Sequence, residues 1–134
     1  MNSQISKRSL NPRLLYVEDD EDSCAALASL LRMSNYDVVT ANTVAEGLRL
    51  AQEEAFDLII LDNWFKQSSG VELCRRIREF NSEIPILFYS AAGYETDISS
   101  GMGAGADDYI VKPDFEQFKQ SLVRLLSLGH RRRS

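Results

Sequence analysis

The sequence predicts an α/β fold in which a parallel five-stranded sheet lies between two layers of helices. Short apolar segments alternate along the chain with longer segments that have helical periodicity. Residues 57–62, Asp-Leu-Ile-Ile-Leu-Asp, contain four consecutive large aliphatic side chains, which is typical of a central strand covered on both faces. With 134 residues the chain has the size of one domain that can bury a substantial core.

The predicted strands are short and rich in β-branched or large aliphatic residues. They are residues 14–17, 37–41, 58–61, 85–90 and 108–111. Pro85 stands at the first position of its strand, where a missing N–H does least harm. The first strand runs directly into an acidic segment, residues 18–22.

The predicted helices follow these strands and have apolar positions at helical spacing. They are residues 22–33, 43–54, 71–81, 94–105 and 114–128. Thr43 and Glu46 have the spacing of a capping box, and Asp114 with Gln117 marks the start of the last helix.

Three glycines weaken the expected helices. Gly101 and Gly103 make the segment 94–105 a poor helix, because each glycine costs about 1 kcal/mol relative to alanine. Gly129 is expected to end the last helix and to leave a basic tail at residues 129–134. Residues 1–12 are polar and are expected to form a flexible N-terminal tail.

Strands that alternate with helices require right-handed crossover connections. The number and length of the segments suit the flavodoxin-like strand order 2-1-3-4-5, a (βα)5 three-layer sandwich. In this order the carboxyl ends of strands 1, 3, 4 and 5 meet at one edge of the sheet. The polar residues expected there are Glu18, Asp19, Asp62, Ser90 and Lys112.

This set of residue types favours phosphoryl chemistry. Three converging carboxylates raise one another's pKa unless a divalent cation lies among them. Hard oxygen ligands that are open to water suit Mg²⁺, with Mn²⁺ as an alternative ion. A lysine and a hydroxyl beside such an ion are what a phosphoryl group requires. Taken alone, Asp62 could instead simply end its strand and begin a turn.

Composition excludes several classes of protein. A net charge of −5 argues against general binding of nucleic acid. Cys24 and Cys74 lack the spacing of a metal site or a disulfide framework, and we expect two buried thiols in a reducing compartment. No apolar run has the length of a membrane span, and the polar start lacks a signal peptide. We therefore expect a cytoplasmic protein.

Four motifs in order resemble the receiver domain of bacterial two-component response regulators, of the stand-alone, single-domain type. They are Val-Glu-Asp-Asp at 17–20, Leu-Asp at 61–62 with Gly70 downstream, Tyr-Ser-Ala at 89–91, and Gly-Ala-Asp-Asp-Tyr-Ile-Val-Lys-Pro at 105–113. The resemblance covers about residues 13–128.

The resemblance implies that Asp62 accepts a phosphoryl group from a histidine kinase. It implies that Mg²⁺ is held by Glu18, Asp19 and Asp62 together with the backbone carbonyl of Trp64. Such a protein is a phosphoacceptor that promotes its own phosphorylation and dephosphorylation, rather than an enzyme with a separate substrate.

The resemblance also implies how the signal leaves the site. Lys112 pairs with the phosphoryl oxygens, Ser90 donates a hydrogen bond to one of them, and the rotamer of Tyr109 follows Ser90. The output is then read by a protein partner on the face formed by the fourth helix, the fifth strand and the fifth helix. The protein is expected to be a monomer or a weak, phosphorylation-dependent dimer.

The loop after Asp62 departs from the family pattern. Lys66 stands where the family usually has a proline, and Trp64 where a small or polar residue is common. Trp64 and Ala92 occupy positions that flank the phosphoryl group in the family, and neither residue can act as a base toward water. We therefore expect a long-lived phosphorylated form; in the rival interpretation, Trp64 points away and anchors a partner.

Three other functions are alternatives to this switch. The chain could be a phosphorelay shuttle that passes the phosphoryl group to a histidine phosphotransfer protein. An aspartate-nucleophile phosphohydrolase would carry a second acid two residues after the nucleophile, where this chain has Trp64. A constitutive interaction module is disfavoured by the complete set of site residues.

Overall fold

The computed structural model describes residues 11–66 and 68–133, without the side chains of residues 130–133. Its strands are β1 (Arg13–Val17), β2 (Asp37–Ala41), β3 (Leu58–Leu61), β4 (Ile86–Ser90) and β5 (Asp108–Val111). Its helices are α2 (Glu21–Met33), α3 (Val44–Glu53), α4 (Gly70–Arg78), α5 (Glu95–Gly103) and α6 (Phe115–Arg133). The predicted segments are therefore confirmed, with ends that differ by a few residues.

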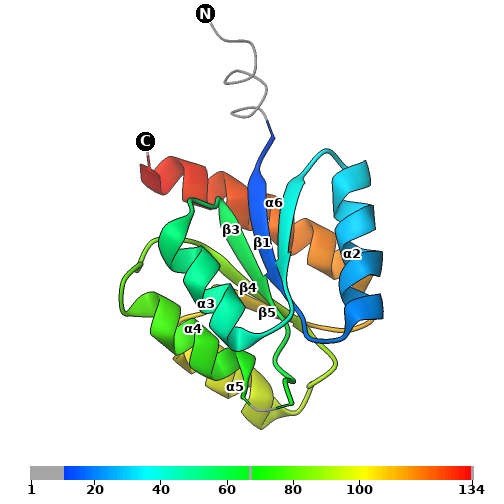
Figure 1. The fold of residues 1–134 in the computed structure, drawn as a ribbon, viewed down its shortest axis with the longest axis vertical. Helices are drawn as coiled ribbons and strands as arrows, with labels where there is room; N and C mark the ends of the chain where they lie inside the picture. Colours follow the sequence, from blue (N-terminus) through cyan, green and yellow to red (C-terminus); the bar gives the residue numbers. More distant parts are fainter. Residues whose placement is uncertain (1–10, 67, 134) are drawn as a thin grey trace, which may run out of the picture.

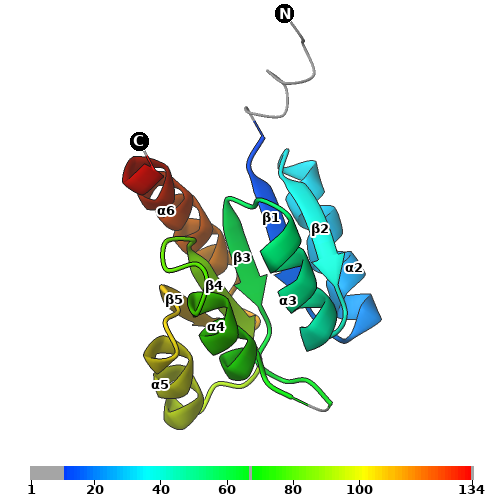
Figure 2. The same ribbon diagram turned by 60° about the vertical axis from the view of Figure 1, so that its left-hand side comes forward.

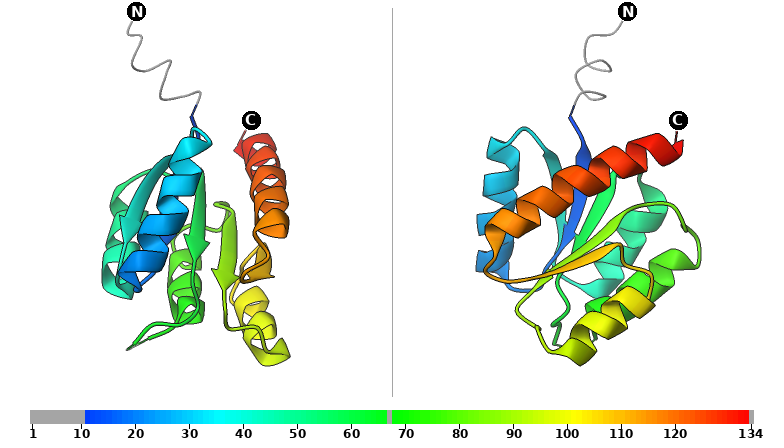
Figure 3. Two further views of the ribbon diagram at one scale, coloured as in Figure 1. Left: turned by 90° about the vertical axis from the view of Figure 1, so that its right-hand side faces the viewer. Right: turned by 180° about the vertical axis from the view of Figure 1, so that it is seen from behind.

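Within the described residues the strands form one parallel sheet in the order β2-β1-β3-β4-β5, which confirms the predicted fold class. Helices α2 and α6 cover one face of the sheet, and α3, α4 and α5 cover the other (Figures 1 and 2). Seen from behind, α6 crosses the sheet with α2 beside it (Figure 3). The three layers expected from alternating strands and helices are present.

Strand alternation divides the core between the two faces. Leu14 and Tyr16 of β1 pack under α2 and α6, whereas Leu15 and Val17 pack under α3 and α4. The β3 residues are at most 1% exposed, because this strand has helices over both faces. The described part of the chain has no helix with the length and hydropathy to cross a membrane.

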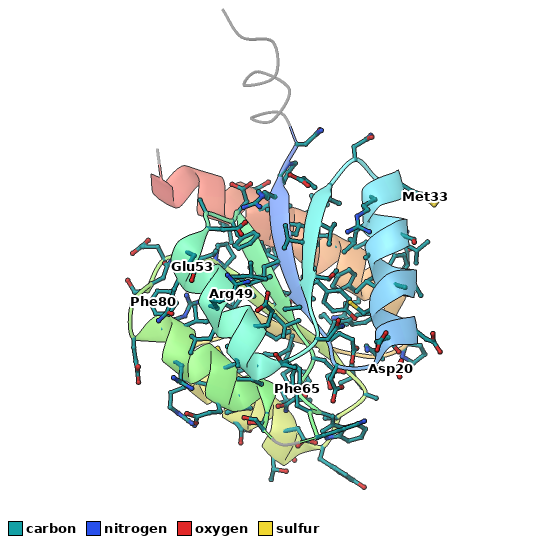
Figure 4. The ribbon with its side chains drawn as sticks, viewed as in Figure 1. Asp20, Met33, Arg49, Glu53, Phe65 and Phe80 are labelled. Atoms are coloured by element: carbon teal, nitrogen blue, oxygen red, sulfur yellow. The ribbon has the colours of Figure 1, made fainter. Side chains whose placement is uncertain are left out.

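Side-chain caps fix where several helices begin. Asp20 accepts a hydrogen bond from Ser23 N (2.8 Å), Thr43 from Glu46 N (3.0 Å), Ser69 from Glu72 N (3.1 Å) and Asp114 from Gln117 N (3.1 Å). The predicted caps at Thr43 and Asp114 are thus confirmed. The carboxylate of Glu46 turns instead to Arg49, which also pairs with Glu53 on the outer face of α3 (Figure 4).

The prediction that Gly129 ends the last helix is wrong. Helix α6 continues through this residue to Arg133, so residues 129–133 of the predicted tail are helical, and Ser134 lies outside the described residues. A Cβ atom on Gly129 would lie 2.8 Å from Cγ of Pro85. Gly129 therefore allows α6 to pass close to the start of β4. In the predicted N-terminal tail, residues 1–10 lie outside the described residues, whereas Pro12 O accepts a hydrogen bond from Asp37 N.

The two glycines of α5 have different surroundings. A Cβ atom on Gly101 would lie 2.9 Å from Cδ2 of Tyr109, so this glycine makes room for a buried aromatic ring. Apart from its chain neighbours and the backbone of its own helix, a Cβ atom on Gly103 would have no atom within 4 Å. Only Gly101 therefore has a packing reason to be a glycine.

This difference gives a matched pair of variants. Gly103→Ala should raise the free energy of unfolding by about 0.5–1 kcal/mol, because alanine favours the helix and meets no neighbour. Gly101→Ala should lower it by about 1–3 kcal/mol through overpacking against Tyr109. Urea unfolding at equilibrium measures both changes. Equal stabilisation by the two substitutions would contradict the packing assigned to Gly101.

Candidate functional site

The carboxyl ends of four strands bring most of the predicted site residues together. Glu18 follows β1, Asp62 follows β3, Ser90 ends β4 and Lys112 follows β5. Glu18, Asp62 and Ser90 are buried, with exposed fractions of 2%, 7% and 0%. This edge of the sheet lies at the bottom of Figure 1, near the labelled Asp20 and Phe65 of Figure 4.

The ammonium group of Lys112 joins the two buried carboxylates. Its Nζ lies 2.9 Å from Oε1 of Glu18 and 3.8 Å from Oδ2 of Asp62. Tyr16 OH also donates to Oε1 of Glu18 (3.2 Å), and Asp20 N donates to Oε2 (3.2 Å). In this state the repulsion expected between the acids is offset by a lysine.

Burial changes the titration of this cluster. It raises the pKa of the Glu18 carboxyl, and the hydrogen-bonded carboxyl of Asp62 raises it further, whereas Lys112 acts in the opposite direction. The pKa of Tyr16 is also raised, first by burial and then by the charge of Glu18. A proton on Glu18 is therefore favoured above the pH at which an exposed glutamate loses it.

Asp19 faces a different partner. Its Oδ2 accepts a hydrogen bond from the backbone N–H of Lys66 (3.2 Å) in the loop after β3. A proline at position 66 would have no N–H to donate, so the departure from the family pattern gives Asp19 this partner. The loop and Asp19 are thereby tied together.

The three acids are contacted by two different groups. The described residues contain no group of three or more histidine, cysteine, aspartate or glutamate side chains arranged to hold a metal ion. Lys112 Nζ contacts both Glu18 and Asp62, while the backbone N–H of Lys66 donates to Asp19. Carboxylate oxygens on adjacent strand ends remain the donor type that suits Mg²⁺.

The two oxygens of Asp62 have different surroundings. Oδ1 accepts hydrogen bonds from Asn63 N (2.7 Å) and Trp64 N (3.5 Å). Oδ2 faces Lys112. The carboxylate is thus oriented by backbone amides on one side and faces a cation on the other.

Ser90 and Tyr109 are linked through the loop after β4. The N–H groups of Ala92 (3.1 Å) and Asn63 (3.3 Å) donate to Oγ of Ser90, and Tyr109 OH donates to Ala92 O (2.5 Å). Tyr109 is 7% exposed and stacks on Phe88 with ring centroids 5.0 Å apart, and burial raises its pKa. Tyr109 therefore points inward.

The predicted flanks of the phosphoryl position differ in exposure. Ala92 is fully buried, whereas Trp64 is 58% exposed. Trp64 lines a surface pocket of about 350 Å³ with Asp97 and Ser100 of α5. A larger hollow of about 680 Å³ lies beside Asp19 and is lined by Phe65 and the start of α3.

The sequence did not predict that two residues, Tyr16 and Asn63, contact the site. Tyr16 was assigned to the strand core, although its position two residues before Glu18 places both side chains on one face of the chain. Asn63 was assigned to the loop, but it is 6% exposed and contacts Tyr109. No periodicity marks Asn63, because its partners lie on other elements.

Comparison with known proteins identifies the family. The family model for the response regulator receiver domain matches residues 14–123. The nisin biosynthesis regulatory protein NisR of Lactococcus lactis subsp. lactis is 41% identical over 101 residues, which cover 75% of this chain and 44% of that protein. This chain therefore spans less than half the length of that relative.

Solved structures have the same fold. The fold matches a receiver domain from Methanospirillum hungatei JF-1 with a TM-score of 0.85 and 24% identity, over 91% of this chain and 98% of that one. It also matches the response regulator TrrA of Thermotoga maritima, solved in complex with Mg(2+)-BeF, with a TM-score of 0.78 and 29% identity, over 85% of this chain and 98% of that one.

The raised pKa of Glu18 predicts a pH dependence of stability without a metal ion. Above the ordinary pKa of 4.5 the unfolded chain loses this proton while the folded chain keeps it, so the free energy of unfolding falls as pH rises toward the folded-state pKa. Glu18→Gln should remove that part of the decline. Urea unfolding in EDTA between about pH 4 and about pH 8 measures the slope.

Glu72→Gln is the control, because Glu72 pairs with Arg75 on the surface of α4. It should leave the slope of wild type unchanged. The same slope in Glu18→Gln and wild type would contradict the assignment to Glu18.

Proposed function

Because the chain belongs to the response regulator receiver domain family, we propose that it is a signalling switch that takes a phosphoryl group on Asp62. The observation that carries this proposal is the placement of the Asp62 carboxylate. It is buried at the sheet edge, with Oδ2 3.8 Å from the ammonium of Lys112 and Oδ1 held by backbone amides. A nucleophilic oxygen is thus oriented beside a cation that can neutralise phosphoryl charge.

The proposed donor is the phosphohistidine of a histidine kinase. An oxygen of Asp62 forms the new bond to phosphorus, and the P–N bond breaks with its electron pair passing to the imidazole of the donor. Lys112 lies close enough to turn from Glu18 toward the new phosphoryl oxygens. Ser90 Oγ already accepts two N–H groups, so a hydrogen bond from Ser90 to a phosphoryl oxygen would use its own hydroxyl proton.

The proposed cofactor is Mg²⁺, held by Glu18, Asp19, Asp62 and the carbonyl of Trp64. Support comes from the oxygen donors on the strand ends and from the Mg(2+)-BeF complex of the Thermotoga maritima relative. When bound, the ion supplies positive charge that offsets the charge of the phosphoryl oxygens. Lys112 would then release Glu18, and the N–H of Lys66 would release Asp19, so that both carboxylates could bind the ion.

The proposed output face consists of α5, β5 and α6, which is read by a protein partner. Tyr109 of β5 lies against Gly101 of α5 and is bonded to Ala92 in the loop after Ser90. A shift of Ser90 toward a phosphoryl group would therefore change the packing of Tyr109 at this face. The alternative of a phosphohydrolase has less support, because the exposed Trp64 stands where such enzymes carry a second acid.

The phosphoacceptor assignment predicts a simple incorporation experiment. Wild type with Mg²⁺ and a small phosphodonor such as phosphoramidate should give a shifted band in phosphate-affinity electrophoresis. Asp62→Asn or added EDTA should abolish the band, because the nucleophile or the metal is then missing. Asp57→Asn is the matched control, since Asp57 precedes the same strand at its opposite end. Incorporation that survives Asp62→Asn or EDTA would refute the proposal.

A second proposal concerns the lifetime of the phosphorylated form. Water must approach the phosphorus in line, and the flanking side chains govern its access. Ala92 is buried and non-polar, and Trp64 offers only an indole N–H. We propose that these flanks make the phosphorylated protein long-lived.

Trp64→Asn should then lose its phosphoryl group several-fold faster, which corresponds to about 1 kcal/mol in the barrier. The decay of purified phosphorylated protein measures this rate. Trp64→Phe is the control, since it keeps a bulky apolar ring and should decay like wild type. Equal half-lives for all three proteins would exclude shielding and would assign the exposed indole to partner docking.

A further inference from the structure

Asn63 is a buried polar residue whose side chain reaches from the loop of Asp62 to Tyr109. It is 6% exposed and directly follows Asp62. Its Oδ1 accepts a hydrogen bond from Val71 N (3.3 Å) at the start of α4, and its Nδ2 donates to Tyr109 OH (3.3 Å). One amide therefore bridges α4 and β5.

The hydrogen-bond partners determine the orientation of this amide. The backbone N–H of Val71 can only donate, so the oxygen of Asn63 must face it and the NH₂ must face Tyr109. The oxygen of Tyr109 then accepts, and its proton is directed to Ala92 O at 2.5 Å. The bonds run in one direction, from Asn63 to Tyr109 to Ala92, and each strengthens the next.

The same residue also contacts the other parts of the site. The backbone N–H of Asn63 donates to Oδ1 of Asp62 and lies 3.3 Å from Oγ of Ser90, which also accepts from Ala92 N. The contacts close a ring through Asn63, Tyr109, Ala92 and Ser90. The aromatic ring of Tyr109 is held between Phe88 and Gly101.

We propose that Asn63 is a positioning residue that holds Tyr109 in its buried orientation before any phosphoryl group is present. Rotation of Tyr109 outward would leave the NH₂ of Asn63 and the carbonyl of Ala92 without these partners in a buried site. Asn63 thus biases the protein toward the inward state of Tyr109. This inference deepens the proposed function, because it assigns a regulatory role to a neighbour of the phosphoacceptor.

Fluorine NMR of unphosphorylated protein tests the orientation of Tyr109. The chain has five tyrosines, and 3-fluorotyrosine labelling with Tyr109→Phe identifies the resonance of Tyr109. In wild type this resonance should have the shift of a buried ring. Asn63→Leu keeps a side chain of similar size but cannot donate a hydrogen bond. It should lower the ratio of inward to outward Tyr109 ring about tenfold, the effect of one lost hydrogen bond.

Asn42→Leu is the matched control. Asn42 lies at the same sheet edge and its side chain donates a hydrogen bond to the carbonyl of Glu18 (2.8 Å), not to Tyr109. Its Tyr109 resonance should equal that of wild type. A wild-type resonance in Asn63→Leu, or an equal change in both variants, would overturn the proposal.

A second measurement needs no substitution of Asn63. In ¹⁵N-labelled protein, the side-chain NH₂ resonances of Asn63 should move when Tyr109→Phe removes the accepting hydroxyl, while those of Asn42 stay in place. Unchanged Asn63 resonances would overturn the proposal even if Asn63→Leu fails to fold. Both measurements are made without a phosphodonor, so their outcome is separate from that of the Asp62→Asn experiment.

Discussion

The charge arrangement of Lys112, Glu18 and Asp62 is the constraint on which the site depends. A parallel sheet brings strand ends together in a partly buried edge, where an uncompensated carboxylate is costly. Lys112 offsets that cost from the far end of the sequence, 94 positions from Glu18. The contact requires the full strand order, because β5 must lie beside β4 and β4 beside β3 before Lys112 can reach both acids.

The same arrangement places carboxylate oxygens, the donors that suit a divalent ion, beside an ammonium group. The two carboxylates lower their repulsion by sharing an ammonium group, and burial raises the pKa of Glu18. Asp19 meets the backbone of Lys66 instead. Each of these contacts uses few atoms, so a cation of higher charge can compete for the same oxygens. The positions of the three carboxylates thus depend on their charged partners as well as on the fold.

The sequence predicted those features that depend on neighbours along the chain. Residues 57–62 identified the central strand because four aliphatic side chains in succession have no polar face. Thr43 and Asp114 were found because a cap binds an N–H three residues away. The end of α6 was predicted wrongly because a helix-ending glycine and a packing glycine look alike in sequence, and only the contact of Gly129 with Pro85 distinguishes them. Asn63 was missed for the same reason, since Tyr109 is 46 positions away.

Short connections make the sheet edge a unit that can transmit a small displacement. Gly70 at the start of α4 packs so closely against the backbone carbonyl of Asp62 that a side chain there would clash with it. Gly70 N also donates to Asn63 O, and Val71 N donates to the side chain of Asn63. A movement of Asp62 therefore has to be accommodated by α4 as well as by Tyr109. Since packed interiors change between discrete arrangements rather than deforming continuously, the polar contacts of Asn63 connect Asp62 to both elements.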